Sequence, residues 1–542
     1  MISLFRANDN HAQQSLFESI QWMNPRIREK LYKSWAPIFY EQVFCKIDEE
    51  PFASLYGTTG KPNFPVNIML SLEYIKHMKN CSDLEIIDDF HFDYLVNYAT
   101  GQRTLGEINL AERTLYYFRE RVYRHCRDNP GEDNLLFGQF IGLLQSFAGK
   151  AKIALGEQRV DTTLFMSNIK KAGRMSLAYD VLVKAVKAIP ESKRSEALAK
   201  ALEPDFRTDV LYRAKAQEGD TRLAILLSLC QEALALLTSI PALTAEAKLV
   251  TRFLAEQAVV DAESGNLMPK SKRDISPASL QSAHDEDATF RRKGNVAQSG
   301  YVLEIAETCD QANPFQLLTD YTVATNNTSD VAILKSRLET IHTNTGCTDI
   351  YADGGFHSVE VHQVAEENDI EIHLTNMTGT APTKIATTEF DIDETSNVIA
   401  RCPKGHIPTR SGVSKGQTSA HFPHTACVNC ELRDQCYSKQ QVQDCVVRIS
   451  LKAVNAGRER AKMQSARKEN TRKRAGIEGS NSALKRTGLA KLNVRGIVKS
   501  TLVCGLKVTA QNIKRLIKYL QGGYQLKDAR FPLQGMPMPI LG

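Results

Sequence analysis

Residues 348–355, Thr-Asp-Ile-Tyr-Ala-Asp-Gly-Gly, combine a short apolar run with a carboxylate and two glycines. The run predicts a strand that ends just before Asp353, because apolar residues followed by a glycine turn are typical of strands. Gly354 and Gly355 permit a tight turn, so the Asp353 carboxylate would project from the end of the strand. An Asp-Gly-Gly turn is common by itself, and its meaning depends on the elements around it.

The predicted elements around residues 348–355 follow a regular order. They are a strand ending at Asp161, strands beginning at Tyr301 and near Gln316, a helix from about 330 to 342, the strand before Asp353, a helix from about 359 to 367 and a strand from 370 to 375. This order predicts an α/β fold with a ribonuclease-H-like mixed sheet. The long helical stretch from about 176 to 262 is then an insertion between the first and second strands.

Glu478 stands nearly alone among cations. On a continuous helix, Arg474, Glu478 and Lys485 would fall within about 40° of one another. That face would offer a carboxylate for a metal ion and two cations for a phosphodiester, whereas the alternative is a solvated basic helix whose glutamate relieves charge repulsion. Gly476 and Gly479 each weaken a helix by up to ~1 kcal/mol. Either they let DNA approach closely, or the helix is irregular there.

The positive charge of the chain is concentrated near its C-terminus. The 542 residues carry a net charge of +6, but residues 451–520 hold 18 Lys and Arg against three Glu, a net +15. The remaining chain is therefore acidic. A basic block of this size indicates a polyanionic partner, nucleic acid first, although a solvated positive face is the alternative.

Three carboxylates have the placement of a metal site. Asp161 and Asp353 at neighbouring strand ends, with Glu478 on a helix crossing the sheet, would form an oxygen-rich cluster suited to Mg²⁺ or Mn²⁺. Two such ions about 4 Å apart promote phosphodiester displacement. Other carboxylates near the predicted sheet are assigned to turns or the surface; they are Asp285, Asp287, Asp320 and Glu360. His357 also follows the Asp-Gly-Gly turn.

Five of the twelve cysteines lie between residues 402 and 445. In a cytosolic chain, a Cys-(two)-Cys pair beside two more thiols indicates structural zinc, because four thiolates complete a tetrahedral shell. The favoured Zn²⁺ ligands are Cys402, Cys427, Cys430 and Cys436; the possible replacements are His406, His421, His424 and Cys445.

Targeting and membrane signals are weak. The first ten residues lack the basic start and apolar core of a signal peptide. No uninterrupted apolar run reaches the ~18 residues that span a bilayer. We therefore expect a cytoplasmic protein, nucleoid-associated when bound to DNA, with no membrane partner.

Three motifs in the chain resemble those of bacterial insertion-sequence transposases of the DDE type. They are Val160-Asp161-Thr162-Thr163, Tyr351-Ala-Asp353-Gly-Gly-Phe356 and Arg474-(three)-Glu478-(six)-Lys485, with Thr471 where the family usually has tyrosine. Residues 39–121 resemble the family's helical N-terminal domain. The segment Ser282-(two)-Asp285-Glu-Asp287-Ala288, with Lys293 and Gly300-Tyr301, resembles the one before its second strand. The four favoured cysteines also match the family's cysteine-rich segment.

The resemblance implies catalytic metal ligands Asp161, Asp353 and Glu478, and DNA contacts by Arg474 and Lys485, to which we add Arg472 and Lys473. It implies an enzyme that binds the two ends of its element, cuts DNA by metal-activated hydrolysis and joins the 3′ ends to target DNA. A homo-oligomer would hold the two ends together. An inactive, transposase-derived DNA-binding regulator and a metal-dependent nuclease without strand transfer are the alternatives.

The expected domains follow from these assignments. They are a helical DNA-binding domain (1–150), the catalytic core (151–168 and 282–380), a helical insertion (169–281), a cysteine-rich zinc segment (381–450), basic helices that complete the core with Glu478 (451–525) and a tail (526–542).

Overall fold

The computed structural model describes residues 5–12, 18–59, 61–130, 134–213, 218–263, 265–293, 296–376 and 384–522. The predicted tail at 526–542 lies outside them. The chain divides into two compact units, Met1–Cys347 with Ile477–Gly542, and Thr348–Gly476.

The first unit begins with helices, as predicted. They are α1 (Pro25–Tyr32), α2 (Trp35–Gln42), α3 (Val66–Lys79), α4 (Asp83–Phe92), α5 (Tyr94–Ala99), α6 (Glu112–Asp128) and α7 (Leu135–Ala151). Pro65 precedes α3, whose residues are nearly all buried. Ser82 and Glu85 form a capping box at the start of α4: the Glu85 amide donates to Ser82 Oγ (3.2 Å), and the Ser82 amide to Glu85 Oε2 (2.7 Å).

An antiparallel sheet follows in the same unit. Its strands are β1 (Glu157–Phe165), β4 (Thr289–Lys293), β5 (Val296–Thr308) and β6 (Leu318–Thr325). Strand β5 is central, because it pairs with β1, β4 and β6. Gly300 of β5 has a φ of +140°, and a Cβ there would lie 2.3 Å from the Phe165 carbonyl oxygen. Only glycine fits this close approach of two strands.

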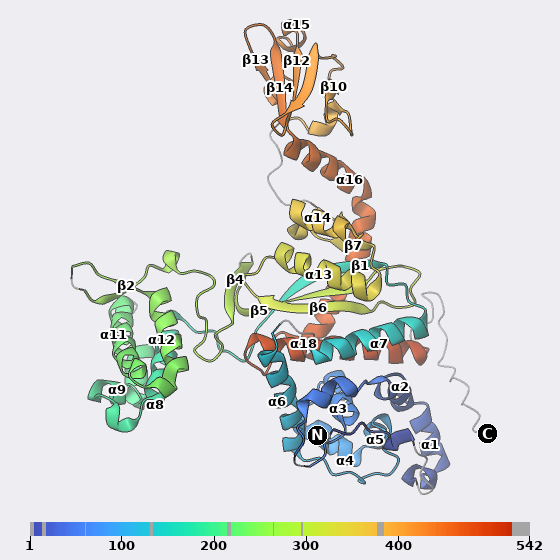
Figure 1. Ribbon diagram of the computed structural model, residues 1–542, viewed down its shortest axis with the longest axis vertical. Helices are drawn as coiled ribbons and strands as arrows, with labels where there is room; N and C mark the ends of the chain where they lie inside the picture. Colours follow the sequence, from blue (N-terminus) through green and yellow to red (C-terminus); the bar gives the residue numbers. More distant parts are fainter. Residues whose placement is uncertain are drawn as a thin grey trace. The chain divides into compact units, whose positions relative to one another are not determined.

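Helices cover both faces of strands β5 and β6 (Figure 1). Helix α13 (Asp330–Thr345) lies on one face, where its Arg337 pairs with Asp320 of β6 at 2.6 Å. Helices α7 and α18 (Ile497–Leu520) lie on the other, where Tyr321 meets the rings of Phe137 and Phe140. The alternation of Asp320 and Tyr321 toward opposite helices follows from the two-residue period of a strand.

The helical insertion, green in Figure 1, has its own apolar core. It contains α8 (Arg174–Ala188), α9 (Glu196–Lys200), α10 (Pro204–Leu211), α11 (Gly219–Thr238), α12 (Thr244–Gln257) and the hairpin of β2 (Ala258–Val260) and β3 (Leu267–Pro269). Helices α8 and α11 end before Pro190 and Pro241, because proline has no amide hydrogen to donate within a helix. Helix α11 has the length and composition to cross a membrane, and one of its faces packs in this core.

The second unit contains a parallel strand pair, long helix α16 (Leu451–Arg474) and smaller sheets. The parallel strands are β7 (Asp349–Ala352) and β8 (Glu371–Leu374), joined by α14 (Val359–Glu367). The smaller sheets contain β9 (Asp391–Ile392), β10 (Ile399–Arg401), β11 (Arg410–Ser414), β12 (Gln417–Phe422), β13 (Ser438–Gln440) and β14 (Cys445–Ser450), with α15 (His424–Cys427) beside them.

The chain order β1, β5, β6, α13, β7, α14, β8 confirms the predicted element order and the mixed α/β, ribonuclease-H-like fold class. The insertion lies between β1 and β5, as expected. After α16 the chain returns to the first unit as α17 (Ile477–Leu484), a π-helical turn (Lys485–Leu489) and α18.

Candidate functional site

Asp161 lies in the middle of β1, not at its end as predicted. Residues 162–165 continue the strand and pair with β5 down to Tyr301, because Phe165 is fully buried and keeps the chain in the sheet. The half-buried Asp161 carboxylate accepts a hydrogen bond from Asn481 Nδ2 of α17 (2.9 Å). The other amide atom, Asn481 Oδ1, is buried and has no hydrogen-bond partner among the described residues. A lone acceptor beside a carboxylate suits a cation or its water ligands.

Glu478 lies one helical turn before Asn481. The buried face of α17 consists of Ile477, Ser480, Asn481 and Leu484, which have the i, i+3, i+4, i+7 spacing of a helix on a core. Glu478 is exposed beside this face. Because residues three apart are neighbours on a helix, Glu478 lies on the side of α17 that contacts Asp161.

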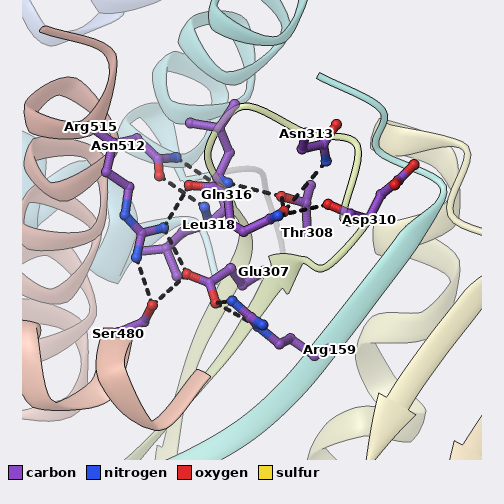
Figure 2. Close-up of polar contacts among 11 residues, drawn as sticks. Arg159, Glu307, Thr308, Asp310, Asn313, Gln316, Leu318, Ser480, Asn512 and Arg515 are labelled. Carbon is purple, nitrogen blue, oxygen red and sulfur yellow. Dashed lines mark hydrogen bonds and ion pairs between the residues drawn. The ribbon is translucent and has the colours of Figure 1, made fainter. Parts of the chain in front are cut away.

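A buried charge network anchors α17 (Figure 2). Glu307 of β5 has a side chain that is only 1% exposed, and it pairs with Arg159 of β1 (2.5 Å) and Arg515 of α18 (2.7 Å). Ser480 of α17 donates its hydroxyl hydrogen to Glu307 and accepts a hydrogen bond from Arg515 (2.6 Å). The network therefore ties α17 to two strands and to α18, which determines where Glu478 sits.

Asp353 follows β7 directly in the second unit, as predicted. Its Oδ1 accepts a hydrogen bond from the Gly355 amide (2.7 Å), and its Oδ2 lies 3.5 Å from Arg474 Nη2. The Gly354 amide donates to Asn376 Oδ1 (2.7 Å), and a Cβ at Gly354 would lie 2.4 Å from the Asn376 carbonyl oxygen. Asn376 therefore approaches so closely that a side chain larger than that of glycine does not fit at position 354.

The residues predicted to bind DNA have different surroundings. Lys473 donates to the Tyr351 hydroxyl (2.9 Å) and lies over its ring, while Arg472 pairs with Glu469 (3.3 Å). Arg474 lies beside Asp353, as described above. Lys485 is exposed at the start of the π-helical turn.

Arg474, Glu478 and Lys485 do not share one continuous helix, which corrects the sequence prediction. Helix α16 ends at Arg474, and α17 begins at Ile477 after a two-residue turn. Gly476 lies in that turn, consistent with its poor helix propensity, so the irregular-helix alternative is the right one. The turn also coincides with the boundary of the two units: Asp161 and Glu478 belong to the first unit, Asp353 and Arg474 to the second.

The competing carboxylates make structural contacts. Asp285 accepts hydrogen bonds from Ser167 and Tyr301 (2.5 Å to the latter), and Asp287 accepts one from the Ile497 amide at the start of α18 (3.1 Å). Asp320 pairs with Arg337. Glu360 lies in the first turn of α14, where a negative charge is favourable.

Histidines near Asp353 pair with other side chains. His357 Nδ1 lies 3.4 Å from His362 Nε2, and burial lowers the pKa of both imidazoles. A separate group, Asp349, Glu371 and His373, brings three possible metal-ligating atoms within 4.8 Å of one another. Asp349 begins β7, whereas Asp353 follows its end, so this group is not the predicted carboxylate site.

The four favoured cysteines line one cavity of about 30 Å³ in the second unit. Cys402 and Cys427 each begin a tight turn: the Cys402 carbonyl accepts from the Gly405 amide (2.8 Å), and the Cys427 carbonyl accepts from the Cys430 amide (3.4 Å). Burial raises the pKa of Cys427 to about 11 and also raises that of Cys436. In the described chain no three of the sulfur atoms lie within 4.8 Å of one another.

The possible replacement ligands have other neighbours. His421 Nδ1 lies 2.7 Å from Asp444 Oδ2, and His424 Nδ1 lies 3.7 Å from the Cys445 sulfur. Cys402, Cys427, Cys430 and Cys436 thus converge on one cavity without a histidine among the residues that line it.

Sequence reasoning missed Asn481, Ser480 and Glu307. The sequence contains a signal for Asn481, because an amide three residues after Glu478 falls on the same helical face as the glutamate. The sequence contains no such signal for Glu307, since its partners Arg159 and Arg515 are far from it in the chain.

Residues 401–517 match a family model described as transposase DDE domain. The matched stretch contains the four cysteines, Arg474, Glu478 and Lys485. Comparisons with curated proteins and with solved structures gave no match. The match supports an enzyme that cuts and joins DNA. More specifically, it supports a transposase of the DDE type.

Proposed function

We propose that the protein binds the ends of its insertion sequence, cuts DNA by hydrolysis and joins the 3′ ends to target DNA. The observation that carries this proposal is the contact between Asp161 and α17, the helix of Glu478, in a chain with a transposase DDE domain. The hydrogen bond from Asn481 brings the strand of Asp161 and the helix of Glu478, far apart in sequence, into contact.

The donor set fits a divalent cation. Asp161 and Glu478 offer oxygen atoms, and Asp353 is proposed as the third carboxylate. Asn481 Oδ1 is a buried acceptor that has no donor among the residues the structure describes. Mg²⁺ or Mn²⁺, when bound, would polarise the phosphodiester and lower the pKa of the attacking water. The histidine-containing group at Asp349 is less suited to Mg²⁺, which prefers oxygen ligands.

The protein's own residues have separate tasks in this proposal. The Asn481 amide orients the Asp161 carboxylate by donating a hydrogen bond to one of its oxygens. Arg474 and Lys485 neutralise phosphate oxygens of the element end, and Lys473 and Arg472 add positive charge along the same stretch. After hydrolysis the freed 3′-hydroxyl is the nucleophile: its oxygen bonds to a target phosphorus, and the displaced target oxygen leaves.

We propose a structural zinc ion held by Cys402, Cys427, Cys430 and Cys436. The convergence of the four cysteines on one cavity supports this site, since the turn from Cys427 to Cys430 brings two thiols together and four thiolates complete a tetrahedral shell. Lys404 pairs with Glu431 at 2.6 Å and links the two turns. The ion would contribute to folding and take no part in strand transfer.

The N-terminal helices are proposed to contact DNA. Helix α6 exposes Tyr116 and Tyr117, which are 60% and 52% exposed, beside the exposed Arg113 and Arg124. Aromatic and cationic side chains on one exposed helix suit a nucleic-acid surface. A homo-oligomer that holds two DNA ends and a cytoplasmic, nucleoid-associated location complete the proposal.

A strand-transfer assay tests the function. The substrates are DNA ends taken from the inverted repeats flanking the gene, with a target plasmid and Mg²⁺. We expect Asp161→Asn, Asp353→Asn and Glu478→Gln each to reduce cleavage and joining by at least about 10³-fold while DNA binding persists, because each removes a proposed metal ligand. The matched control is Glu191→Gln, which changes an exposed carboxylate in the helical insertion.

Three results would contradict parts of this proposal. Near-wild-type cleavage in any of the three variants would remove that residue from the site. Cleavage without joined products would favour a nuclease, and DNA binding without cleavage would favour a regulator.

A further inference from the structure

A polar recess of about 340 Å³ lies beyond the end of β1 in the first unit. Its lining comes from segments 168–172 and 281–284, with Asp180, Lys491 and Arg495. At about 30 Å³ per water molecule, this space could hold roughly ten waters, which is ample for a phosphate group and part of a sugar. Neither the predicted carboxylate site nor the predicted DNA contacts contribute to it.

The walls of the recess are held together by backbone hydrogen bonds. The Asn168 amide donates to the Val494 carbonyl (2.8 Å), and the Leu492 amide donates to the Met166 carbonyl (2.8 Å). Arg495 Nε donates to the Asn168 carbonyl (2.9 Å). The segment after β1 and the segment before α18 are therefore fixed to each other, so the cations they carry are positioned before a ligand arrives.

The recess carries uncompensated positive charge. Lys491 and Arg495 are exposed, and neither pairs with a carboxylate in the described part of the chain, whereas Lys170 pairs with Asp180 (2.9 Å). Burial, and then the positive charge of Arg495, lowers the pKa of His284, which also lines the recess. A neutral histidine can still donate one hydrogen bond.

We propose that this recess binds a backbone phosphate of the DNA on which the enzyme acts, at a distance from the cut bond. The two unpaired cations supply the charge, and neutral groups such as Ser282 can donate further hydrogen bonds. Phe165 lies four residue steps beyond Asp161 along β1, about 13 Å at ~3.3 Å per step. The recess begins beyond that point, so it contacts phosphates about four or more base pairs from the cut, at ~3.4 Å per pair. The inference rests on the proposed function.

Salt-dependent DNA binding by the full chain tests the recess. The probe is a fluorescent DNA duplex of arbitrary sequence, because phosphate contacts do not depend on sequence. We expect Lys491→Ala with Arg495→Ala to weaken binding roughly tenfold and to reduce the slope of log affinity against log salt by about 2. Lys193→Ala with Lys200→Ala removes the same charge from exposed positions of the insertion and should leave the slope unchanged.

A second variant separates binding from folding. Arg495 also holds the Asn168 carbonyl, whereas Lys491 makes no side-chain hydrogen bond among the described residues, so Lys491→Ala alone should reduce the slope by about 1 without changing the melting temperature. Equal slopes in wild type, recess variants and control variant would overturn the recess proposal.

Two further outcomes are distinguishable. If the wild-type chain binds no duplex, the proposed function and the recess proposal both fall. If the recess variants lose binding of inorganic phosphate, measured by calorimetry, but keep the DNA slope, the recess is a site for a free anion and the DNA proposal is wrong.

Discussion

The Asn481 amide is the residue-scale link between the helix of Glu478 and the strand of Asp161. It holds one Asp161 oxygen at 2.9 Å and leaves its own Oδ1 without a partner in the described residues. Groups that orient metal ligands are as important for a site as the ligands, because a carboxylate that rotates freely binds a cation less well.

Replacing Asn481 should show whether its amide orients the Asp161 carboxylate or only stabilises the fold. We expect Asn481→Ala to reduce DNA cleavage by about 10–100-fold, because the Asp161 carboxylate loses its fixed donor. Raising the Mg²⁺ concentration should restore part of the rate, which a purely structural defect would not do. Ser482→Ala, at an exposed position of the same helix, is the control. An unchanged rate at low Mg²⁺ would contradict this role.

Glu304 is a buried carboxyl group on β5 whose titration should make the stability of the protein depend on pH. Burial, reinforced by Asp320, raises its pKa well above 4.5. The folded protein therefore retains a proton that the unfolded chain loses, so this group's contribution to stability falls as pH rises above about 4.5, by up to about 1.4 kcal/mol per pH unit. We expect Glu304→Gln to remove this decline, measured as the free energy of unfolding in urea from pH 5 to pH 8. Parallel curves for wild type and variant would show that Glu304 does not titrate abnormally.

At the scale of elements, helix α17 is placed by charge as well as by apolar packing. Glu307 forms ion pairs with Arg159 of β1 and Arg515 of α18, and it accepts a hydrogen bond from Ser480 of α17 (Figure 2). Apolar burial alone would let a short helix shift along its axis. Directional hydrogen bonds to a buried carboxylate restrict such a shift.

Removing Glu307 should loosen this helix. We expect Glu307→Ala to lower the free energy of unfolding by about 3–5 kcal/mol, because two nearly buried guanidinium groups lose their carboxylate. Glu307→Gln should cost less, since it keeps hydrogen-bond acceptors. Chemical denaturation measures both, with Glu191→Gln as an exposed control. A loss below about 1 kcal/mol for Glu307→Ala would show that the network contributes little.

At the scale of the whole molecule, the second unit contains a part with a very small apolar core. The sheets around β12 and β14 bury only a few large apolar side chains in the described residues, among them Phe390, Ile399 and Phe422. Small segments of this kind usually need a metal or disulfides to fold. The cysteine cavity lies against this core, since Phe422 and Val447 also line it.

Zinc removal should therefore unfold this segment selectively. We expect about one zinc ion per purified chain, and we expect chelation to make residues 384–450 sensitive to protease while the helical insertion stays resistant. Cys430→Ser should behave like chelation, whereas Cys45→Ser, at an exposed cysteine of the first unit, should not. Metal analysis well below one equivalent would exclude the four-cysteine site.

Much of the fold was predictable because it depends on local patterns. Helix α14 has the predicted limits, since they follow from a few adjacent residues. The predicted end of β1 at Asp161 was wrong. Thr162 and Thr163 are polar residues, and they stay in the strand only through their pairing with β5. The prediction of one continuous helix through Arg474 and Glu478 was wrong for a similar reason. The spacing of charged residues carries no information about a turn at Gly476.

The sequence by itself determined the element order, the carboxylate and cysteine motifs and the concentration of positive charge, because these are properties of neighbouring residues. Only the tertiary structure decided that Asn481 contacts Asp161, that Glu307 joins three elements, and that Lys491 and Arg495 line one recess. These contacts join residues far apart in the chain, so packing and strand register, and no local pattern, determine which side chains meet. The turn at Asp353 depends on both sequence and tertiary structure. Its position could be predicted from Asp-Gly-Gly, but position 354 requires glycine because the fold places Asn376 against Gly354.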